Sequence, residues 1–158
     1  MPALSPFWTV YLFTLTGVLG LVMGSFLTCL AWRLARGESV LRGRSHCDAC
    51  GHVLGPPDLV PVFSWLFLRG RCRYCGSRVS ARSTAVELLT AAVYLSLVLR
   101  YGLTPEALRF AVLASLLIPA ALVDLDVGEL PDGLTLAGVV WFVLSALLRP
   151  ADLPGSLL

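Results

Sequence analysis

The chain has 158 residues, of which 57% are hydrophobic and 14% are charged, and its mean hydropathy is +0.82. A soluble domain carries about a quarter charged residues, so these values exclude an ordinary soluble protein and indicate that part of the chain is solvated by lipid. The net charge of +2 gives no reason to expect a nucleic-acid partner.

The first apolar stretch, residues 7–32, contains 26 residues and no charge. As a helix it would be about 39 Å long, enough to cross a hydrocarbon core of about 30 Å with some tilt. It is too long for the apolar region of a signal peptide, and no basic segment precedes it, so we predict an uncleaved span. Gly20 and Gly24 give this helix a face of small residues on which another helix could pack.

Three more apolar stretches follow, at about residues 84–99, 107–125 and 133–148. We expect the first two to be spans. The last is about 24 Å long as a helix, which is marginal for a complete crossing. The pattern predicts an all-α polytopic membrane protein with about four transmembrane helices.

The arginines predict the orientation of these spans. Between Arg33 and Arg82 there are nine arginines and three acidic residues, and the chain has no lysine. Because positive loops are retained on the cytoplasmic side, we expect this loop to be cytoplasmic and the amino terminus to be outside. The acidic segment from Asp124 to Asp132 then lies on the same side of the membrane as the basic loop.

This loop also contains two CxxC pairs, each followed by a glycine and separated by 21 residues, a spacing typical of zinc ribbons. The four expected ligands are Cys47, Cys50, Cys72 and Cys75. Four protein thiolates complete a tetrahedron and leave no position for water, so the metal would be structural. Redox-active pairs and unliganded thiols are the alternatives. We expect His46 and His52 to flank the site without ligating, and Cys29 to fill apolar space in the first span.

An apolar run that ends in arginines, residues 58–71, lies between the two pairs. It is too short to cross the membrane. It could form an amphipathic helix on the membrane surface or pack under the cysteine motif.

Carboxylates follow the third apolar stretch, beginning with Asp124. A polar exit loop is the simplest interpretation, since a span must end in polar residues. However, Asp124 falls within the helical period, and the stop signals, Gly128 and Pro131, come later. Pro119 breaks the backbone ladder and leaves the Ser115 carbonyl without its usual partner, which would bend the helix near a water-accessible cavity. A carboxylate at the edge of such a cavity is a candidate functional residue.

In their order along the chain, these motifs resemble those of the bacterial prepilin peptidases, membrane aspartic proteases that process type IV prepilins and type II secretion pseudopilins. The resemblance covers roughly residues 17–135. It is carried by the segments 24–27 and 33–34 (GSFL and RL), 44–51 (RSHCDACG), 58–65 (DLVPVFSW), 69–76 (RGRCRYCG), 87–89 (ELL) and 124–132 (DLDVGELPD).

The resemblance implies cleavage of a prepilin leader just after a glycine, at the cytoplasmic face of the inner membrane. It also implies methylation of the new amino terminus by S-adenosylmethionine. Asp124 is the implied catalytic aspartate, whereas Asp126 and Asp132 belong to the surrounding motif. The family's second aspartate lies in a Gly-x-Gly-Asp motif, which does not occur here. We therefore expect an amino-terminal part of a longer enzyme, unable to hydrolyse peptides by itself.

Two smaller departures from the family pattern are Thr28, where asparagine is usual, and Ser83-Thr84, where Tyr-Pro is usual. We expect three regions: a first transmembrane helix (1–35), a cytoplasmic zinc-binding insertion (36–82) and further spans of the peptidase domain (83–158). The alternatives from other classes are a non-enzymatic zinc-ribbon membrane module that docks a partner, and a thiol oxidoreductase that uses the CxxC pairs.

Overall fold

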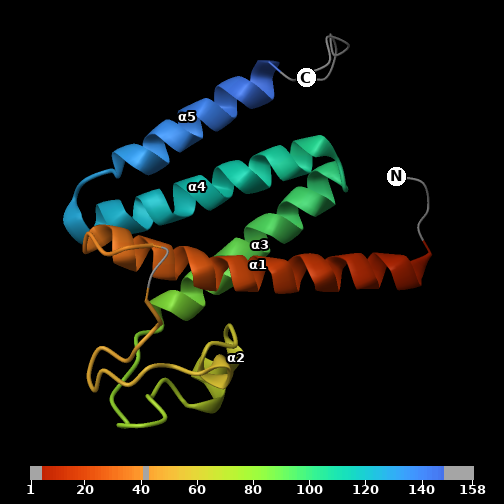
Figure 1. Ribbon diagram of the computed structural model, residues 1–158. Helices are drawn as coiled ribbons and strands as arrows, with labels where there is room; N and C mark the ends of the chain where they lie inside the picture. The colour runs from red at the N-terminus through yellow and green to blue at the C-terminus, as the bar shows by residue number, and fades with distance from the viewer. Residues whose placement is uncertain (1–4, 41–42, 148–158) are drawn as a thin grey trace.

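A computed structural model describes residues 5–40 and 43–147, and among them no strand is longer than an isolated β-bridge. Four long helices form the body of the molecule: α1 (Pro6–Ala35), α3 (Arg82–Tyr101), α4 (Pro105–Val127) and α5 (Asp132–Leu147). The segment between α1 and α3 contains a 3-10 turn, η1 (Pro56–Asp58), and a short helix, α2 (Phe63–Phe67). Figure 1 shows this insertion on one side of the helix bundle.

Three of the helices are long and apolar enough to cross a membrane: α1, α3 and α4. This confirms the three predicted spans, although each helix extends past its apolar run at both ends. The predicted fourth span is also a helix, but α5 has 16 residues and remains shorter than the hydrocarbon core. The predicted end of that span, Leu148, and the segment 152–158 lie outside the described residues.

The helix ends follow local signals in the sequence. Pro105 opens α4 behind Thr104, whose side chain accepts a hydrogen bond from the Ala107 N–H at 3.4 Å. At the other end Gly128, with φ of +72°, donates its N–H to the Asp124 carbonyl at 2.8 Å. The predicted stop is thereby confirmed, and α4 includes Asp124 in its last turn.

The bundle is held by the close approach of α1 and α3. A Cβ atom added at Gly20 would lie 2.5 Å from the Ala91 Cα, and one added at Gly24 would lie 2.6 Å from the Glu87 Cα. No larger residue fits at either position without a shift of the backbone. The predicted small-residue face of the first span therefore serves helix packing, as expected for helices in lipid.

Polar contacts connect the remaining helices. The Tyr94 hydroxyl on α3 lies 2.6 Å from the Ser115 hydroxyl on α4, and Ser115 itself donates to the Ala111 carbonyl. On α5, the Trp141 indole donates to the Arg109 carbonyl at 3.2 Å. No residue of α5 is buried, and this helix packs on one side of α4 and leaves its other side open (Figure 1).

Candidate functional site

The first cysteine pair forms a tight hydrogen-bonded turn, residues 45–54, which we call the first knuckle. The Cys47 N–H donates to the His52 carbonyl at 2.9 Å, and the Gly51 N–H donates back to the Cys47 carbonyl at 2.8 Å. Gly51 has φ of +69°, a conformation that a residue with a side chain adopts at a cost. The glycine after the CxxC pair is thus required by the turn, as the sequence predicts.

The second pair repeats this turn in residues 70–79, the second knuckle. The Cys72 N–H donates to the Ser77 carbonyl at 2.8 Å, the Gly76 N–H donates to the Cys72 carbonyl at 3.0 Å, and Gly76 has φ of +70°. Each donor and acceptor number is 25 higher than its counterpart in the first knuckle. The insertion therefore contains one local structure built twice, with its two cysteine pairs facing each other.

The two knuckles bring the four predicted ligands together. The Sγ atoms of Cys47, Cys50, Cys72 and Cys75 all lie within 4.8 Å of one another, and those of Cys47 and Cys75 are 3.9 Å apart. Four sulfurs at about 2.3 Å from a central zinc would be separated by about 3.8 Å. All four are free thiols. The donor set, its number and its spacing therefore fit a zinc ion.

Hydrogen bonds lower the pKa of two of the four thiols, those of Cys47 and Cys75. The backbone N–H groups of Cys50 and Ala49 lower the pKa of Cys47 to about 6. The hydroxyl of Ser77, 3.0 Å from the Cys75 sulfur, lowers the pKa of that thiol. The His52 backbone N–H acts in the same direction on Cys50, but burial and the neighbouring thiols outweigh it and raise the Cys50 pKa to about 11. A divalent cation would therefore be needed to hold all four groups as thiolates.

The remaining candidates for ligation lie elsewhere. The His52 ring stacks on Tyr74 with ring centroids 3.6 Å apart, and the His46 ring packs against Trp32 at 5.8 Å. Cys29 lies half-buried in α1, away from the cluster. Among the described residues, the four-sulfur group includes none of these three side chains.

Two side chains support the knuckles from outside. Asp58 receives a hydrogen bond from the Arg73 guanidinium at 2.7 Å and another from the Tyr74 hydroxyl at 3.1 Å. The guanidinium holds the pKa of Asp58 below its usual range. The indole of Trp65 donates to the Val79 carbonyl at 3.1 Å and packs over Gly70, where an added Cβ would lie 3.0 Å from the ring. Both contacts tie η1 and α2 to the second knuckle.

A buried carboxylate connects the insertion to the helix bundle. Glu87, in the second turn of α3, is 5% exposed, and its Oε2 accepts a hydrogen bond from the Val62 N–H at 2.7 Å. Its Oε1 accepts from the Ser83 hydroxyl at 3.4 Å. Val62 directly precedes α2 and has φ of +63°, a strained conformation for a β-branched residue. The strained residue is thus the one whose N–H is hydrogen-bonded to the Glu87 carboxylate, and this bond fixes the backbone of the insertion at that point.

A second polar contact joins the ends of two helices. The Arg82 guanidinium at the start of α3 forms an ion pair with Asp126 in the last turn of α4, and it also donates to the Leu122 carbonyl at 3.1 Å. This pair brings the basic insertion and the acidic segment to the same end of the bundle. The sequence predicted that the two segments share a membrane surface, but it did not predict which residues meet.

Asp124 is the implied catalytic residue, and it lies exposed in the last turn of α4. No hydrogen bond or ion pair of its carboxylate occurs among residues 5–40 and 43–147. Asp126, two residues later, is engaged by Arg82, and Asp132 begins α5. Within the described ranges Asp126 is therefore the one carboxylate of this segment held by a salt bridge, whereas Asp124, like Glu129 and Asp132, is exposed and free of one.

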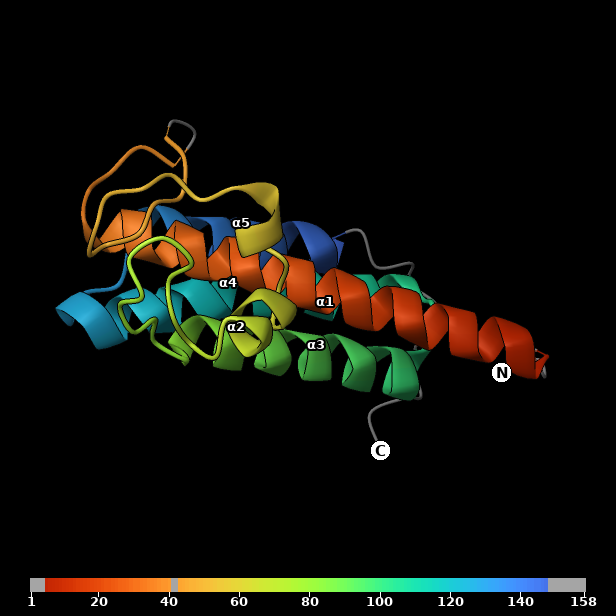
Figure 2. The same ribbon diagram turned by 90° about the horizontal axis from the view of Figure 1, so that it is seen from below.

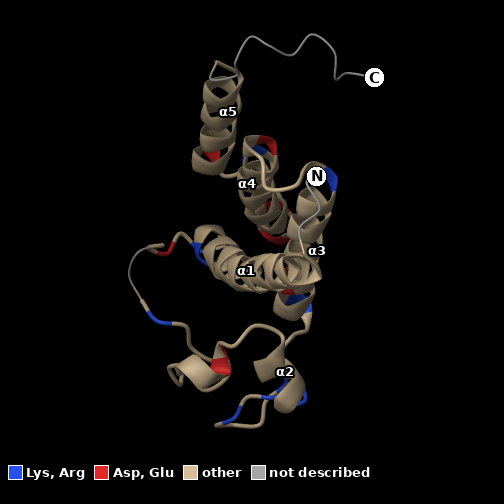
Figure 3. Ribbon diagram, turned by 90° about the vertical axis from the view of Figure 1, so that its right-hand side faces the viewer, with Lys and Arg blue, Asp and Glu red and all other residues tan. Residues whose placement is uncertain are grey.

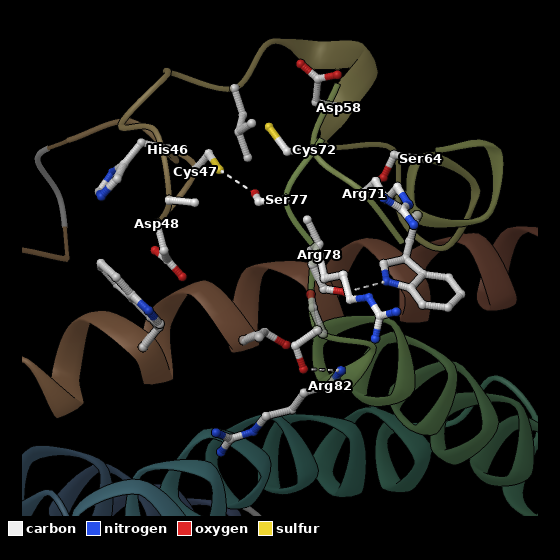
Figure 4. Close-up of a pocket in the computed structure, with 18 of the residues that line it drawn as sticks. His46, Cys47, Asp48, Asp58, Ser64, Arg71, Cys72, Ser77, Arg78 and Arg82 are labelled. Carbon is white, nitrogen blue, oxygen red and sulfur yellow. Dashed lines mark hydrogen bonds between the residues drawn. The ribbon is translucent and has the colours of Figure 1, made fainter. Parts of the chain in front are cut away.

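A cavity of about 520 Å³ lies between the insertion and the bundle. Figure 4 shows it bounded by the knuckles on one side and by α1, α3 and the end of α4 on the other. Its wall includes Trp32, Asp48, Arg78, Arg82 and Asp126. A cavity near the end of α4 was expected, but its wall includes Asp126 and not Asp124. Pro119, expected to bend α4 beside this space, is fully buried.

Glu87 and Arg82 are the two residues whose roles the sequence did not indicate. In the sequence, Glu87 stands out only as part of the segment 87–89 that carries the family resemblance. An acid in an otherwise apolar stretch was the available signal, since such a residue is costly in lipid unless it has a partner. The identity of that partner, a backbone N–H 25 residues earlier, is not visible in the sequence.

Comparison with known proteins identifies relatives of this chain. A profile of the Bacterial Peptidase A24 N-terminal domain matches residues 18–101. The prepilin leader peptidase/N-methyltransferase of Myxococcus xanthus (strain DK1622) is 44% identical over 135 residues, which cover 85% of this chain and 39% of the relative. That of Bacillus subtilis (strain 168) is 32% identical over 135 residues, covering 85% and 54% of the two chains.

A third relative is the type 4 prepilin-like proteins leader peptide-processing enzyme of Escherichia coli O78:H11 (strain H10407 / ETEC). It is 38% identical over 145 residues, which cover 80% of this chain and 54% of the relative. The chain thus spans about half the length, or less, of these relatives. No solved structure matches it.

Proposed function

The chain belongs to the bacterial A24 peptidases, whose N-terminal domain it contains, and we propose that it is the amino-terminal part of a prepilin peptidase. The enzyme would cleave leader peptides from type IV prepilins and type II secretion pseudopilins and methylate the new amino terminus. Similarity to relatives named for both activities, over 85% of this chain, is the observation that carries the proposal.

Peptide hydrolysis by aspartates requires two carboxyl groups that share one proton. One activates the attacking water as a general base, while the other donates a proton to the carbonyl oxygen or the leaving amine. We assign one of the two carboxyls to Asp124 and expect the other to come from outside the 158 residues. Because the two titrations are coupled, the working pKa values would belong to the pair.

The surroundings of Asp124 support this assignment over its neighbours. A carboxylate that forms a salt bridge is stabilised in its charged form and is a poor proton donor. Asp126 is in that situation, since Arg82 binds it. Asp132 lies in the first turn of α5, where the helix dipole stabilises a negative charge. Asp124 has neither restraint and is exposed at the end of α4.

The four cysteines would hold a structural zinc that cross-links the two knuckles and, with all four positions filled, offers none to a substrate water. A catalytic thiol pair is disfavoured, because the four sulfurs converge on one point with the spacing of metal ligands. The methyl group would come from S-adenosylmethionine. The cavity beneath the insertion is of the size that ligands of this class occupy, and its wall offers an indole, Trp32, and charges of both signs, Asp48 and Arg78.

We further propose an orientation in the inner membrane with the amino terminus outside and the insertion in the cytoplasm. The excess of arginine in the insertion supports it. The corresponding organisation is a first span in residues 1–35, a zinc-binding insertion in 36–82 and further spans in 83–158. In this orientation Asp124 faces the compartment from which the prepilin leader emerges.

The decisive experiment compares two isosteric variants of the full-length enzyme, Asp124→Asn and Asp132→Asn, in membranes with a prepilin substrate. Loss of the Asp124 carboxyl should reduce the cleavage rate by more than about a thousandfold, since no general acid–base group remains at that position. Asp132→Asn should cleave at close to the wild-type rate, and both should retain zinc. Normal cleavage by Asp124→Asn would remove this residue from the active site. Absence of cleavage by the unchanged full-length protein would instead favour a zinc-binding module without peptidase chemistry.

A further inference from the structure

The short helix α2 has two different faces. Ser64, Trp65 and Leu68 line the cavity toward the bundle. Phe63, Leu66 and Phe67, at the i, i+3 and i+4 positions of the opposite face, are 52%, 61% and 81% exposed. The outward face is thus the more apolar of the two. We call these three residues, together with the exposed Leu59 and Val60 that precede them, the apolar ridge of the insertion.

An apolar face of this kind is expected inside a soluble domain, not on its surface. The knuckles do not cover it, because both supporting contacts of the insertion, Asp58 with Arg73 and Trp65 with Val79, lie on the other side of α2 or before it. Something outside the insertion must therefore cover the apolar ridge. The position of the ridge relative to the membrane spans indicates what that is.

The Val62–Glu87 hydrogen bond fixes that position. Glu87 lies five residues inside α3 from Arg82, about 7.5 Å along the helix axis, and Ser83 and Glu87 bond to each other within the first turns. The amide that precedes α2 is bonded to this carboxylate at 2.7 Å. The beginning of α2 is thus level with the first turns of a membrane span. Figures 1 and 2 agree, since in both α2 lies beside the carboxyl-terminal half of α1 rather than beyond its end.

At this level the ridge continues a surface that already faces lipid. The nearby outward residues of the spans, Phe26 on α1 and Leu88 and Leu89 on α3, are exposed and apolar in the same way. At the carboxyl end of α2, Arg69 is exposed, whereas Arg71 also lines the cavity toward the bundle and the two ion pairs of the described residues use Arg73 and Arg82. Figure 3 marks the arginine positions of the insertion in blue, in the loop that follows α1 and around α2, at the end of the insertion away from the bundle. Guanidinium groups next to an apolar face suit the phosphates of a bilayer surface.

We propose that α2 is an interfacial membrane anchor. The apolar ridge lies in the leaflet nearest the insertion, Arg69 reaches the headgroup phosphates, and Glu87 satisfies the backbone N–H that would otherwise enter the bilayer without a partner. This last contact explains a carboxylate in a span, because an unpaired amide at membrane depth is costly. The cysteine insertion is then held against the membrane from two sides, by protein through Glu87 and by lipid through the ridge.

Photo-crosslinking tests this anchor in the full-length protein. A benzophenone amino acid replaces Phe67 in one sample and Tyr74, which is 48% exposed on the second knuckle, in a matched control. Both proteins are reconstituted in vesicles of phosphatidylethanolamine and phosphatidylglycerol that contain alkyne-tailed lipid. We expect several-fold more lipid adduct at position 67 than at position 74. Equal labelling at the two positions, or adducts at position 67 that contain only a prepilin or a second copy of the chain, would overturn the proposal.

Variants of the carboxylate test the other half of the anchor. With the probe at position 67, Glu87→Ala should lower the lipid adduct several-fold, whereas Glu87→Gln, which keeps an acceptor oxygen, should preserve most of it. Zinc content reports whether the knuckles remain folded in each variant. The proposal can still be decided if Glu87→Ala does not fold. The probe at position 67 in the otherwise unchanged protein alters only one exposed side chain, and its labelling by lipid is sufficient.

Discussion

The insertion and the helix bundle are stabilised in opposite ways. Between residues 43 and 81 the buried residues are few, chiefly Cys47, Gly70 and Cys72, and the two knuckles are built from short-range backbone hydrogen bonds. The bundle instead relies on contacts between helices far apart in the sequence, such as Gly20 with Ala91. The first region needs ligands and turn residues in the right places, whereas the second needs small residues that let backbones approach.

This difference determines which changes each region tolerates. A region with so small an apolar core depends on its cross-link, because burial alone cannot offset the conformational entropy of ordering the chain. A bundle in lipid has little hydrophobic drive between its helices, so it depends on close packing. Removing the cross-link should therefore unfold the insertion alone, and filling the helix contact should disturb the bundle alone.

The largest effect on stability is expected in the insertion, from the loss of one of the four cysteine ligands. Cys72→Ser removes a buried sulfur from the four-sulfur cluster and should abolish zinc binding. Structural zinc contributes about 10–16 kcal/mol of apparent binding energy in small zinc peptides, so the knuckles should unfold without it. The measurements are zinc per chain and the rate of trypsin cleavage at the arginines of the insertion, which should rise sharply while the helical circular dichroism of the spans persists.

Cys29→Ser is the matched control, since Cys29 lies in α1 outside the cluster. It should retain close to one zinc per chain and the trypsin resistance of the wild-type protein. A Cys72→Ser protein that still binds one zinc with a resistant insertion would show that the sulfurs are not the ligands.

A smaller effect, now on the bundle, is expected from Gly24→Val. The added Cβ would lie 2.6 Å from the Glu87 Cα, so α1 and α3 must separate. Overpacking of this kind costs about 1–3 kcal/mol of unfolding free energy. The measurement is the unfolding free energy in mixed detergent micelles, with zinc content unchanged. At Gly17 an added Cβ would meet only the Leu95 side chain at 3.8 Å, so Gly17→Val should be much less destabilising. Equal losses at both positions would argue against the packed interface.

The same contrast explains how much of the structure could be predicted from the sequence. The spans were predicted within a few residues because apolar length and caps such as Gly128 are local signals. The knuckles were predicted because Gly51 and Gly76 mark turns that local backbone geometry requires. At its carboxyl end α1 continues three residues past its apolar run, to Ala35, and so includes Arg33.

The contacts between the two regions could not be predicted, because they have no local signal. The Val62 amide and the Glu87 carboxylate are 25 residues apart, and Arg82 and Asp126 are 44 residues apart. Val62 is also an unfavourable residue for positive φ, so local preference pointed away from the observed backbone. Asp124 was predicted from the family pattern. That it has no salt bridge within the described part of the chain, whereas Asp126 is paired with Arg82, could be learned only from the structure.

The smallest effect on the unfolding free energy is expected from the partly exposed ion pair between α3 and α4, at the end of the bundle next to the insertion. Arg82 and Asp126 form an ion pair, but both side chains are partly exposed, so solvent screens the attraction. Pairs of this kind contribute about 0.2–1 kcal/mol. A double-mutant cycle with Arg82→Ala, Asp126→Ala and the double variant should give a coupling free energy in that range, measured by unfolding in mixed micelles and reduced by added salt.

The two single variants should nevertheless differ. Arg82→Ala also removes the hydrogen bond to the Leu122 carbonyl at 3.1 Å, whereas Asp126→Ala leaves that contact in place. Arg82→Ala should therefore be the more destabilising of the two, by roughly the 0.5–1.5 kcal/mol of one hydrogen bond. A larger loss for Asp126→Ala, or a coupling well above 1 kcal/mol, would mean that this contact is shielded from water and joins α3 to α4 more firmly than its exposure indicates.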